Sequence, residues 1–191
     1  MNLSEKITVK NVKEGIVEIL PNLNIKENPN ILDVGSFGRH GLNGSQAIMD
    51  NFYNKSNITA MSYYNNIPTC YTNVIHLKGD YFSYKKLDTF DLIYFDLGWE
   101  GQLRMIENEL KTLMYERLND GGYLIFYMFN TNGYTAGRER IQENLNNFWN
   151  TSNLNSLSIV ETLNNLNSKY KIKFINPETI RPIITWITLQ K

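Results

Sequence analysis

The segment that most constrains this chain is a short apolar run that ends in an acid and passes into a glycine-rich turn, over residues 30–41. It reads Asn-Ile-Leu-Asp-Val-Gly-Ser-Phe-Gly-Arg-His-Gly. We expect a strand over Ile31 to Gly35, because the run is apolar. The glycines let the backbone turn sharply and approach a ligand where a Cβ would collide. A parallel strand passes its chain to a cofactor-binding loop in this way, so the segment predicts an α/β sheet.

Apolar residues after this turn recur in runs that alternate between strand spacing and helix spacing. Strands that alternate with helices form a parallel sheet, and two strands close together at the end of the chain form an antiparallel addition at its edge. We therefore predict a single α/β domain over residues 1–191, in which residues 1–29 supply an N-terminal helix and a loop. The expected strands are 31–35, 58–62, 74–77, 91–96, 123–129, 169–175 and 183–189, and the expected helices are 10–20, 43–53, 102–118 and 138–167.

The most regular helical pattern covers residues 102–118, where leucine, isoleucine and methionine recur at helical spacing. The sequence Asn-Asp-Gly-Gly follows at residues 119–122, and glycine commonly ends a helix because it adopts the left-handed conformation. We expect the helix to end there and the next strand to begin at Tyr123. The preceding strand, 91–96, is apolar between two acids, as in a strand covered on both faces.

The charge balance limits the classes of partner. The chain carries 19 Lys and Arg and 19 Asp and Glu, so its formal net charge is zero, which gives no broad attraction for nucleic acid. Cys70 is the one cysteine, so no internal disulfide or zinc cage can form, and a reduced, intracellular setting is expected. No apolar run approaches the roughly 20 residues that span a bilayer, and the N-terminus lacks the apolar stretch of a signal peptide. We expect a cytoplasmic protein with no membrane partner, and leave open whether it forms a homo- or hetero-oligomer.

Four segments, in order along the chain, resemble motifs of the class I S-adenosylmethionine (SAM) dependent methyltransferases. Ile31 to Gly35 resembles motif I, and Gly79-Asp80 resembles the turn whose acid lies near the adenine. Phe90 to Asp96 resembles motif IV, and Leu118 to Phe126 resembles the turn before the fifth strand of that family. The resemblance covers nearly the whole chain. It implies a divergent member of the superfamily, with a doubly wound, mostly parallel seven-stranded sheet and an antiparallel C-terminal strand.

The resemblance also implies an activity. SAM would be the cofactor, and its methyl group would pass in line to an oxygen or nitrogen of the acceptor, a reaction that relies largely on proximity and orientation. We expect a small-molecule or saccharide acceptor, because the net charge is neutral and Phe95 to Gly101 resemble the small-molecule O-methyltransferases. Metal-dependent members carry an acid pair after strand five. Residues 129–132 read Phe-Asn-Thr-Asn instead, so no metal is predicted.

The candidate site residues come from the carboxyl ends of the strands and from the turns that follow them. Asp96 lies at the carboxyl end of its strand, where ligands bind in open α/β sheets, and could act as a general base toward a hydroxyl. His40, in the first loop, is a second candidate base. Asp33 could orient the loop amides or accept from the ligand's amino group. The structural alternatives are a cap of a loop or helix for the acids and simple exposure for the histidine. The expected cofactor-binding residues are Asp33, Gly35, Ser36, Phe37, Gly38, Gly41, Ser62, Tyr63, Asp80 and Tyr81.

Two departures from the family pattern motivate other hypotheses. Phe37 and Arg39 occupy loop positions where the family has glycine, and would place bulk where the methionine part of SAM passes. The second strand ends in Ser62 and Tyr63 instead of the acid that accepts hydrogen bonds from the ribose. A hydrogen bond to a neutral group contributes about 1 kcal/mol, against about 1.5–3 kcal/mol for a charged one. The alternatives are therefore a catalytically inactive, methyltransferase-like binding or scaffold subunit, or a component of a nucleic-acid methyltransferase.

Overall fold

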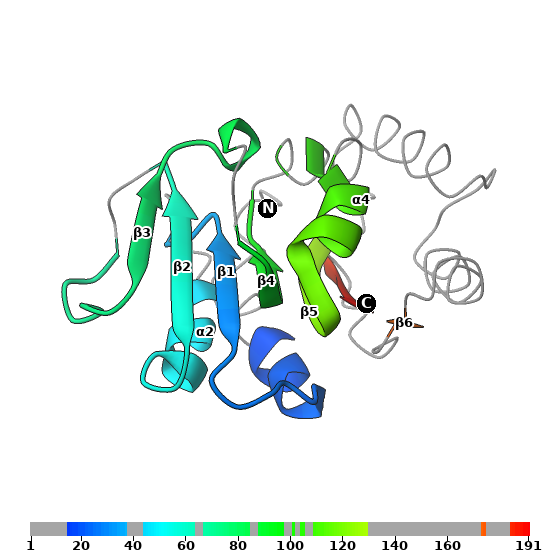
Figure 1. Cartoon of the computed structure of the whole chain (residues 1–191), viewed down its shortest axis with the longest axis horizontal. Helices are drawn as coiled ribbons and strands as arrows, with labels where there is room; N and C mark the ends of the chain where they lie inside the picture. The colour runs from blue at the N-terminus through cyan, green and yellow to red at the C-terminus, as the bar shows by residue number, and fades with distance from the viewer. Residues whose placement is uncertain are drawn as a thin grey trace, which may run out of the picture.

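In the computed structural model of the protein, seven strands of the described chain form one sheet (Figure 1). The structure describes residues 15–37, 44–63, 67–84, 88–97, 101, 104–105, 109–129, 173–174 and 184–191. The strand order is β3-β2-β1-β4-β5-β7-β6. The strands are β1 (Asn30–Val34), β2 (Asn57–Ser62), β3 (Ile75–Lys78), β4 (Phe90–Phe95), β5 (Leu118–Phe129), β6 (Lys173–Phe174) and β7 (Ile184–Gln190).

The sheet is parallel from β3 through β5, and β7 runs antiparallel to both of its neighbours, β5 and β6. This confirms the predicted mostly parallel sheet of seven strands with an antiparallel C-terminal strand. The predicted bounds of β1 to β4 and of β7 lie within one residue of those observed. The carboxyl ends of β1 to β4 meet at one edge of the sheet, which we call the carboxyl-end edge. Asp33 of β1 is in register with Tyr94 of β4 beside it.

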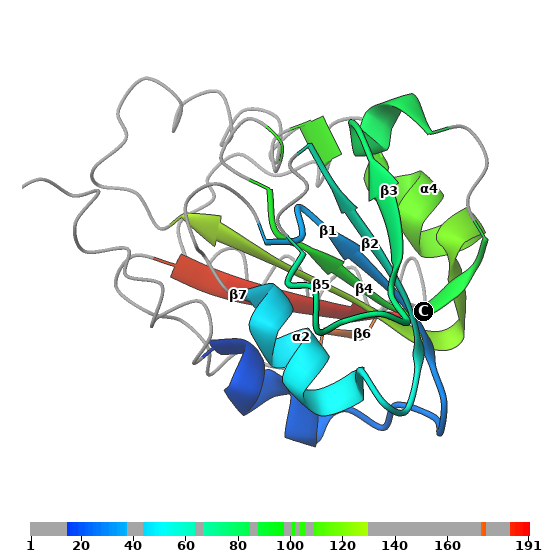
Figure 2. The same ribbon diagram turned by 90° about the vertical axis from the view of Figure 1, so that its left-hand side faces the viewer.

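Helices cover both faces of the sheet (Figure 2). Helix α2 (Gly44–Phe52) and the helical residues 15–19, which continue into the 3-10 helix η2 (Leu20–Asn22), lie on one face. On the other face, α4 (Leu110–Thr112) runs directly into the π-helix η5 (Leu113–Arg117). The 3-10 helix η3 (Tyr81–Ser83) adds Tyr81 to the core of that second face. The arrangement is the predicted doubly wound one.

Alternate residues of the central strands point to opposite faces, so they build two cores. Leu92 and Tyr94 of β4 belong to the core beneath α2, whereas Ile93 and Phe95 belong to the core beneath η5. All six residues of β4 are buried, as expected for a strand covered on both faces. The α2-side core also contains Ile16, Ile19, Ile31, Phe37, Ile48, Tyr127 and Trp186, and the η5-side core also contains Leu32, Val34, Tyr81, Leu113, Met114 and Leu124.

The turn before β5 differs from the prediction. The helix ends at Arg117, and β5 begins at Leu118 rather than at Tyr123. Gly121 therefore caps no helix. Its φ of 78° lies inside β5, beside the place where the pairing with β4 shifts register between Phe90 and Leu92. Glycine suits such a bulge because it adopts a positive φ at no steric cost.

Two predicted elements lie wholly or mostly outside the described residues. The helix predicted over 138–167 lies outside the described residues, and of the strand predicted over 169–175 only β6 is described. Among the helices of the described ranges, none is long and apolar enough to cross a membrane.

Candidate functional site

Asp33 and Asp96 lie at the carboxyl-end edge, on the neighbouring strands β1 and β4. Asp33 is the fourth residue of β1, and Asp96 directly follows β4. The backbone N–H of Asp96 donates to the carbonyl oxygen of Val34 at 2.7 Å, which extends the pairing of the two strands by one step. Both side chains are buried. The fold therefore brings together the two acids that the sequence singled out.

Gly35 makes the close approach of these two strands possible. Its φ is +85°, and a Cβ built on it would lie 1.8 Å from the backbone carbonyl oxygen of Asp96. The N–H groups of Gly35 and Ser36 both donate to the carbonyl oxygen of Met61 in β2, at 2.8 and 3.1 Å. Glycine is therefore required at this turn, as predicted, and the group that it approaches is the protein's own chain. The binding of a cofactor by Gly35 and Ser36 stays a prediction.

Phe37 adopts a left-handed backbone conformation with φ 49°, which is uncommon for a residue other than glycine. Its N–H donates to Ser45 Oγ at 3.2 Å, and its ring stacks on Tyr71 with centroids 6.0 Å apart. The side chain is 9% exposed and belongs to the α2-side core. This differs from the expectation of a ring lying in the path of the methionine part of SAM, because in this conformation the ring packs between α2 and Tyr71.

The Asp33 carboxylate is fully buried and incompletely hydrogen-bonded. Ser45 Oγ, in the first turn of α2, donates to Asp33 Oδ1 at 3.1 Å, whereas Oδ2 has no hydrogen-bond donor among the described residues. Burial raises the pKa of Asp33 to about 6, although Ser36 and Ser45 act to lower it. An acid of this kind can exchange its proton, or accept from a cationic ligand, near neutral pH.

Asp96 is held by a tyrosine from the neighbouring strand β5. Tyr127 donates its hydroxyl proton to Asp96 Oδ1 at 2.9 Å. Burial raises the pKa of Asp96 to about 7, and the negative charge of Asp33 also acts to raise it. The hydrogen bonds of Tyr127 and Tyr94 act to lower this pKa. Because a general base works best when its pKa is close to the operating pH, this environment suits the role predicted for Asp96.

The ends of β2 and β3 carry a second group of predicted residues. The buried Ser62 hydroxyl lies 3.3 Å from His76 Nε2, so one hydrogen bond of Ser62 is made within the protein. Tyr63 is 59% exposed, and desolvation together with the Asp80 carboxylate raises the pKa of its hydroxyl. Asp80 Oδ1 accepts from the N–H of Phe82 and so caps η3, and Oδ2 lies 3.4 Å from Arg104 Nη1. Asp80 thus caps η3 beside the exposed Tyr63, and binding of a cofactor by Asp80 stays a prediction.

The Tyr81 ring lies in the η5-side core, packed edge-on against Phe95 with centroids 5.1 Å apart. Burial raises the pKa of its hydroxyl above the usual tyrosine value. The ring therefore contributes to packing, and binding of a cofactor by Tyr81 stays a prediction.

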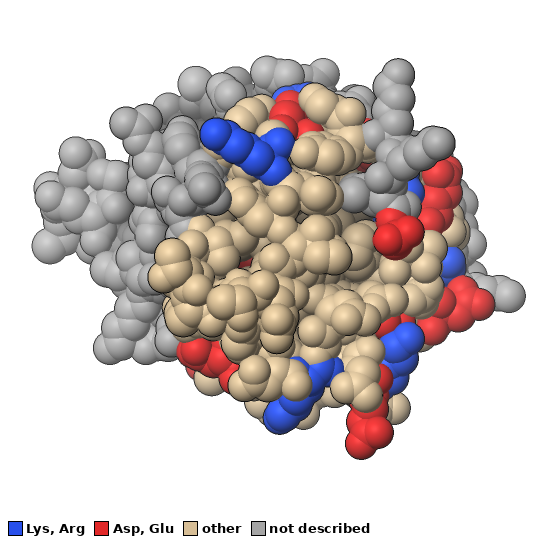
Figure 3. Space-filling view, turned by 60° about the vertical axis from the view of Figure 1, so that its left-hand side comes forward, with Lys and Arg blue, Asp and Glu red and all other residues tan. Residues whose placement is uncertain are grey.

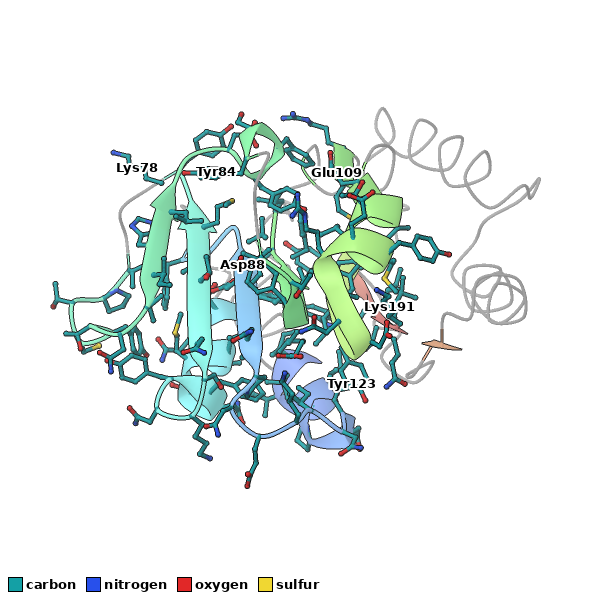
Figure 4. All side chains as sticks on the ribbon, viewed as in Figure 1. Lys78, Tyr84, Asp88, Glu109, Tyr123 and Lys191 are labelled. Carbon is teal, nitrogen blue, oxygen red and sulfur yellow. The ribbon has the colours of Figure 1, made fainter. Side chains whose placement is uncertain are left out.

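Figure 4 shows the general layout: Lys78, Tyr84 and Glu109 lie toward the carboxyl-end edge, and Tyr123 lies at the opposite end of the sheet.

The remaining predicted residues, Gly38, His40 and Gly41, lie outside the described residues, as does Arg39. In the described ranges, no group of three or more His, Cys, Asp or Glu side chains could hold a metal ion. Sequence reasoning missed Tyr127 and Ser45. A tyrosine within a buried strand was an available signal for Tyr127, because a buried tyrosine hydroxyl usually has a hydrogen-bond partner. No comparable signal marked Ser45.

Comparisons with known proteins bear on the fold. No protein-family model and no curated protein sequence matches the chain. The structure is similar to that of a proposed rRNA methylase from Clostridium thermocellum, with a TM-score of 0.56 and 14% identity over 95% of each chain. The fold is that of the class I methyltransferases.

Two further class I methyltransferase structures are similar. The N-methyltransferase NodS from Bradyrhizobium japonicum has a TM-score of 0.52 and 12% identity, over 95% of this chain and 97% of that one. An O-methyltransferase from Planctomyces limnophilus, in complex with apigenin, has a TM-score of 0.52 and 15% identity, over 99% of this chain and 60% of that one. One is an N-methyltransferase and the other an O-methyltransferase, so proteins of this fold methylate different kinds of atom.

Proposed function

We propose that the protein is a SAM-dependent methyltransferase that acts on a hydroxyl or amine of a small molecule or saccharide. The observation that carries this proposal is the pair of buried acids, Asp33 and Asp96, at the carboxyl ends of adjacent strands in a class I methyltransferase fold. Ligands of open α/β sheets bind outside the carboxyl ends of the strands. Buried acids whose pKa values are raised toward neutrality cluster at functional sites.

The residues at this edge suit the polar groups of SAM. The unsatisfied Oδ2 of Asp33 offers a buried acceptor for an ammonium group, and such charge-assisted hydrogen bonds are the strong ones. Tyr63 and Asp80, at the ends of β2 and β3, offer a hydroxyl and a carboxylate for the ribose. SAM, when bound, supplies an electrophilic methyl group on its sulfonium. Asp96 would accept the proton that the acceptor's hydroxyl or amine loses as it is methylated.

The charge distribution around the site favours a neutral acceptor over nucleic acid. No Asp, Glu, Lys or Arg occurs between Lys55 and Lys78, the stretch that supplies β2 and β3. Figure 3 brings the β3 side of the molecule forward, and its centre is mostly uncharged, with Lys, Arg, Asp and Glu set around the rim. Arg104, near the end of β3, is already paired with Asp80. Recognition of a phosphate backbone relies on many lysine and arginine contacts, and the described residues at the centre of this face offer few.

Calorimetric titration with SAM and with its demethylated product, S-adenosylhomocysteine, tests the proposal. We expect both to bind, and we expect the Asp33→Ala variant to lose binding while it remains folded by circular dichroism. Absence of binding at millimolar ligand would overturn the enzymatic proposal for the isolated chain.

One observation favours the alternative of a binding or scaffold subunit. The end of β2 carries no carboxylate, and the Ser62 hydroxyl that stands there already contacts His76. A subunit that has lost SAM binding would show no heat with either ligand and would retain its fold in the Asp33→Ala variant. A nucleic-acid methyltransferase component would instead bind SAM and transfer labelled methyl groups to RNA.

A further inference from the structure

Tyr127 connects strand β5 to the acid at the end of β4. Its side chain is fully buried in the α2-side core. The hydroxyl donates to Asp96 Oδ1 at 2.9 Å and lies 3.4 Å from the carbonyl oxygen of Leu97, the next residue of the chain. The tyrosine thus contacts both the carboxylate and the backbone that carries it.

Packing fixes the direction of this hydroxyl. The Tyr127 ring meets Trp186 of β7 edge-on, with centroids 5.1 Å apart. Trp186 in turn stacks on Tyr94 of β4, with centroids 6.3 Å apart and an interplanar angle of 28°. Because a phenol oxygen lies in the plane of its ring, a ring held between neighbouring strands also holds its oxygen. The hydroxyl is therefore preorganised toward Asp96.

We propose that Tyr127 is the positioning residue of Asp96, and that its hydrogen bond to Oδ1 holds the carboxylate in place to take the acceptor's proton. Asp96 is 8% exposed, whereas Asp33 is 0% exposed, so of the two buried acids Asp96 lies nearer to the surface. This inference rests on the proposed function, because it assigns Asp96 to the acceptor.

The surroundings of Asp96 explain why a positioned donor is needed. Among the described residues, the groups that face its carboxyl are Asp33 from β1, Tyr94 from β4 and Tyr127 from β5. Burial and the Asp33 charge favour the protonated form, and the hydroxyls of Tyr127 and Tyr94 favour the carboxylate. Tyr127 makes the hydrogen bond at 2.9 Å, so it is the main group that keeps Asp96 available as a base.

The Tyr127→Phe variant separates the hydroxyl from the ring. The phenylalanine ring can fill the same space against Trp186, so a role in packing alone would leave the titration of Asp96 unchanged. Tyr123 offers a matched control. It is buried on the same strand and the same face, but its hydroxyl lies within hydrogen-bond distance of the Asn24 N–H and Gln190 Nε2, away from Asp96.

The test is an NMR titration of Asp96 in the ligand-free protein, with isotope-labelled aspartate carboxyl groups and Asp96→Asn for assignment. We expect Tyr127→Phe to make Asp96 about tenfold weaker as an acid, and Tyr123→Phe to leave it unchanged. A fluorinated tyrosine at position 127, a stronger donor of the same shape, should move the titration in the opposite direction.

An unchanged Asp96 titration in either Tyr127 variant, or an equal shift in Tyr123→Phe, would overturn the assignment. The fluorinated protein keeps the test decisive if Tyr127→Phe does not fold. Because no SAM is used, failure of this inference is distinguishable from failure of the proposed function, which the SAM titration alone measures.

Discussion

The two ends of strand β4 carry buried aspartates whose pKa values are shifted in opposite directions. Asp91, at the amino end, accepts hydrogen bonds from the Asn30 N–H at 2.7 Å and Asn119 Nδ2 at 2.8 Å, and its carboxylate lies 2.9 Å from Lys26 Nζ. Burial acts to raise the pKa of Asp91, but Lys26, Asn30 and Asn119 outweigh it, and the net pKa is lowered. Asp96, just past the carboxyl end, accepts from the Tyr127 hydroxyl at 2.9 Å and has a pKa raised to about 7.

This difference is the one expected between an acid that stabilises the fold and an acid that the proposed function uses. The donors around Asp91 join the loop before β1, β1 itself and the start of β5, so its charge contributes to stability. Asp33 and Asp96 are buried with few donors, and burial without full compensation costs free energy. A protein retains such groups where activity requires them, at the expense of stability.

The pH dependence of stability is the largest effect that this comparison predicts. A carboxyl whose pKa is raised on folding binds its proton more tightly in the folded state than in the unfolded state. The free energy of unfolding therefore falls as the pH rises from the pKa of the unfolded state to the pKa of the folded state. Asp33 and Asp96 shift from 3.8 to about 6 and about 7. The free energy of unfolding should therefore fall by about 4 kcal/mol between about pH 5 and about pH 8. The contribution of Asp91 has the opposite sign and is lost only at more acidic pH, as pH falls through its lowered pKa.

Urea denaturation across this range measures the effect. The double variant Asp33→Asn/Asp96→Asn should give a much flatter profile than the wild type. A wild-type stability that is constant or that rises across the range would break the comparison.

Removal of the amino-end acid should have the next largest effect. Asp91→Ala leaves the Lys26 charge and the Asn30 and Asn119 donors without their acceptor, so we expect a loss of about 3 kcal/mol in the free energy of unfolding. Asp120→Ala is the control, because the Asp120 side chain is 96% exposed and its ion pair with Lys191 should contribute little. Equal denaturation midpoints for the two variants would show that Asp91 does not stabilise the fold.

The smallest effect that we predict is a gain in the free energy of unfolding, on substitution of Asp33. Asp33→Asn removes a buried charge and keeps an oxygen that can accept from Ser45, so we expect a gain of about 1 kcal/mol at about pH 8. The measurement is the same urea denaturation. A loss of stability comparable with that of Asp91→Ala would show that the two ends of the sheet do not differ.

The sequence was sufficient for the architecture because strand and helix spacing are local patterns. The fully buried β4 and the alternation of its residues between two cores follow from its run of apolar residues. Gly121 was misassigned because a left-handed glycine serves a helix cap and a strand bulge equally well, and only the pairing with β4 distinguishes the two.

The position of the candidate site in the fold was predictable from the sequence, but the contacts between its side chains were less so. Asp33 and Asp96 were identifiable because they lie at the carboxyl ends of two strands that meet at one edge of the sheet. The direction of the Phe37 ring was not, because it depends on a backbone angle and on Tyr71, which lies far along the chain. The pairing of Tyr127 with Asp96 joins residues that are 31 positions apart, and no local pattern reports it.

The central claim is that the acids of the carboxyl-end edge serve ligand binding rather than stability. Its most direct test is a titration with SAM of the wild type, Asp33→Asn and Asp91→Asn, with the free energy of unfolding measured for each. We predict that Asp33→Asn is at least as stable as the wild type and does not bind SAM, whereas Asp91→Asn is less stable and binds SAM as the wild type does. Retained SAM binding in Asp33→Asn, or loss of binding in a folded Asp91→Asn, would contradict the account.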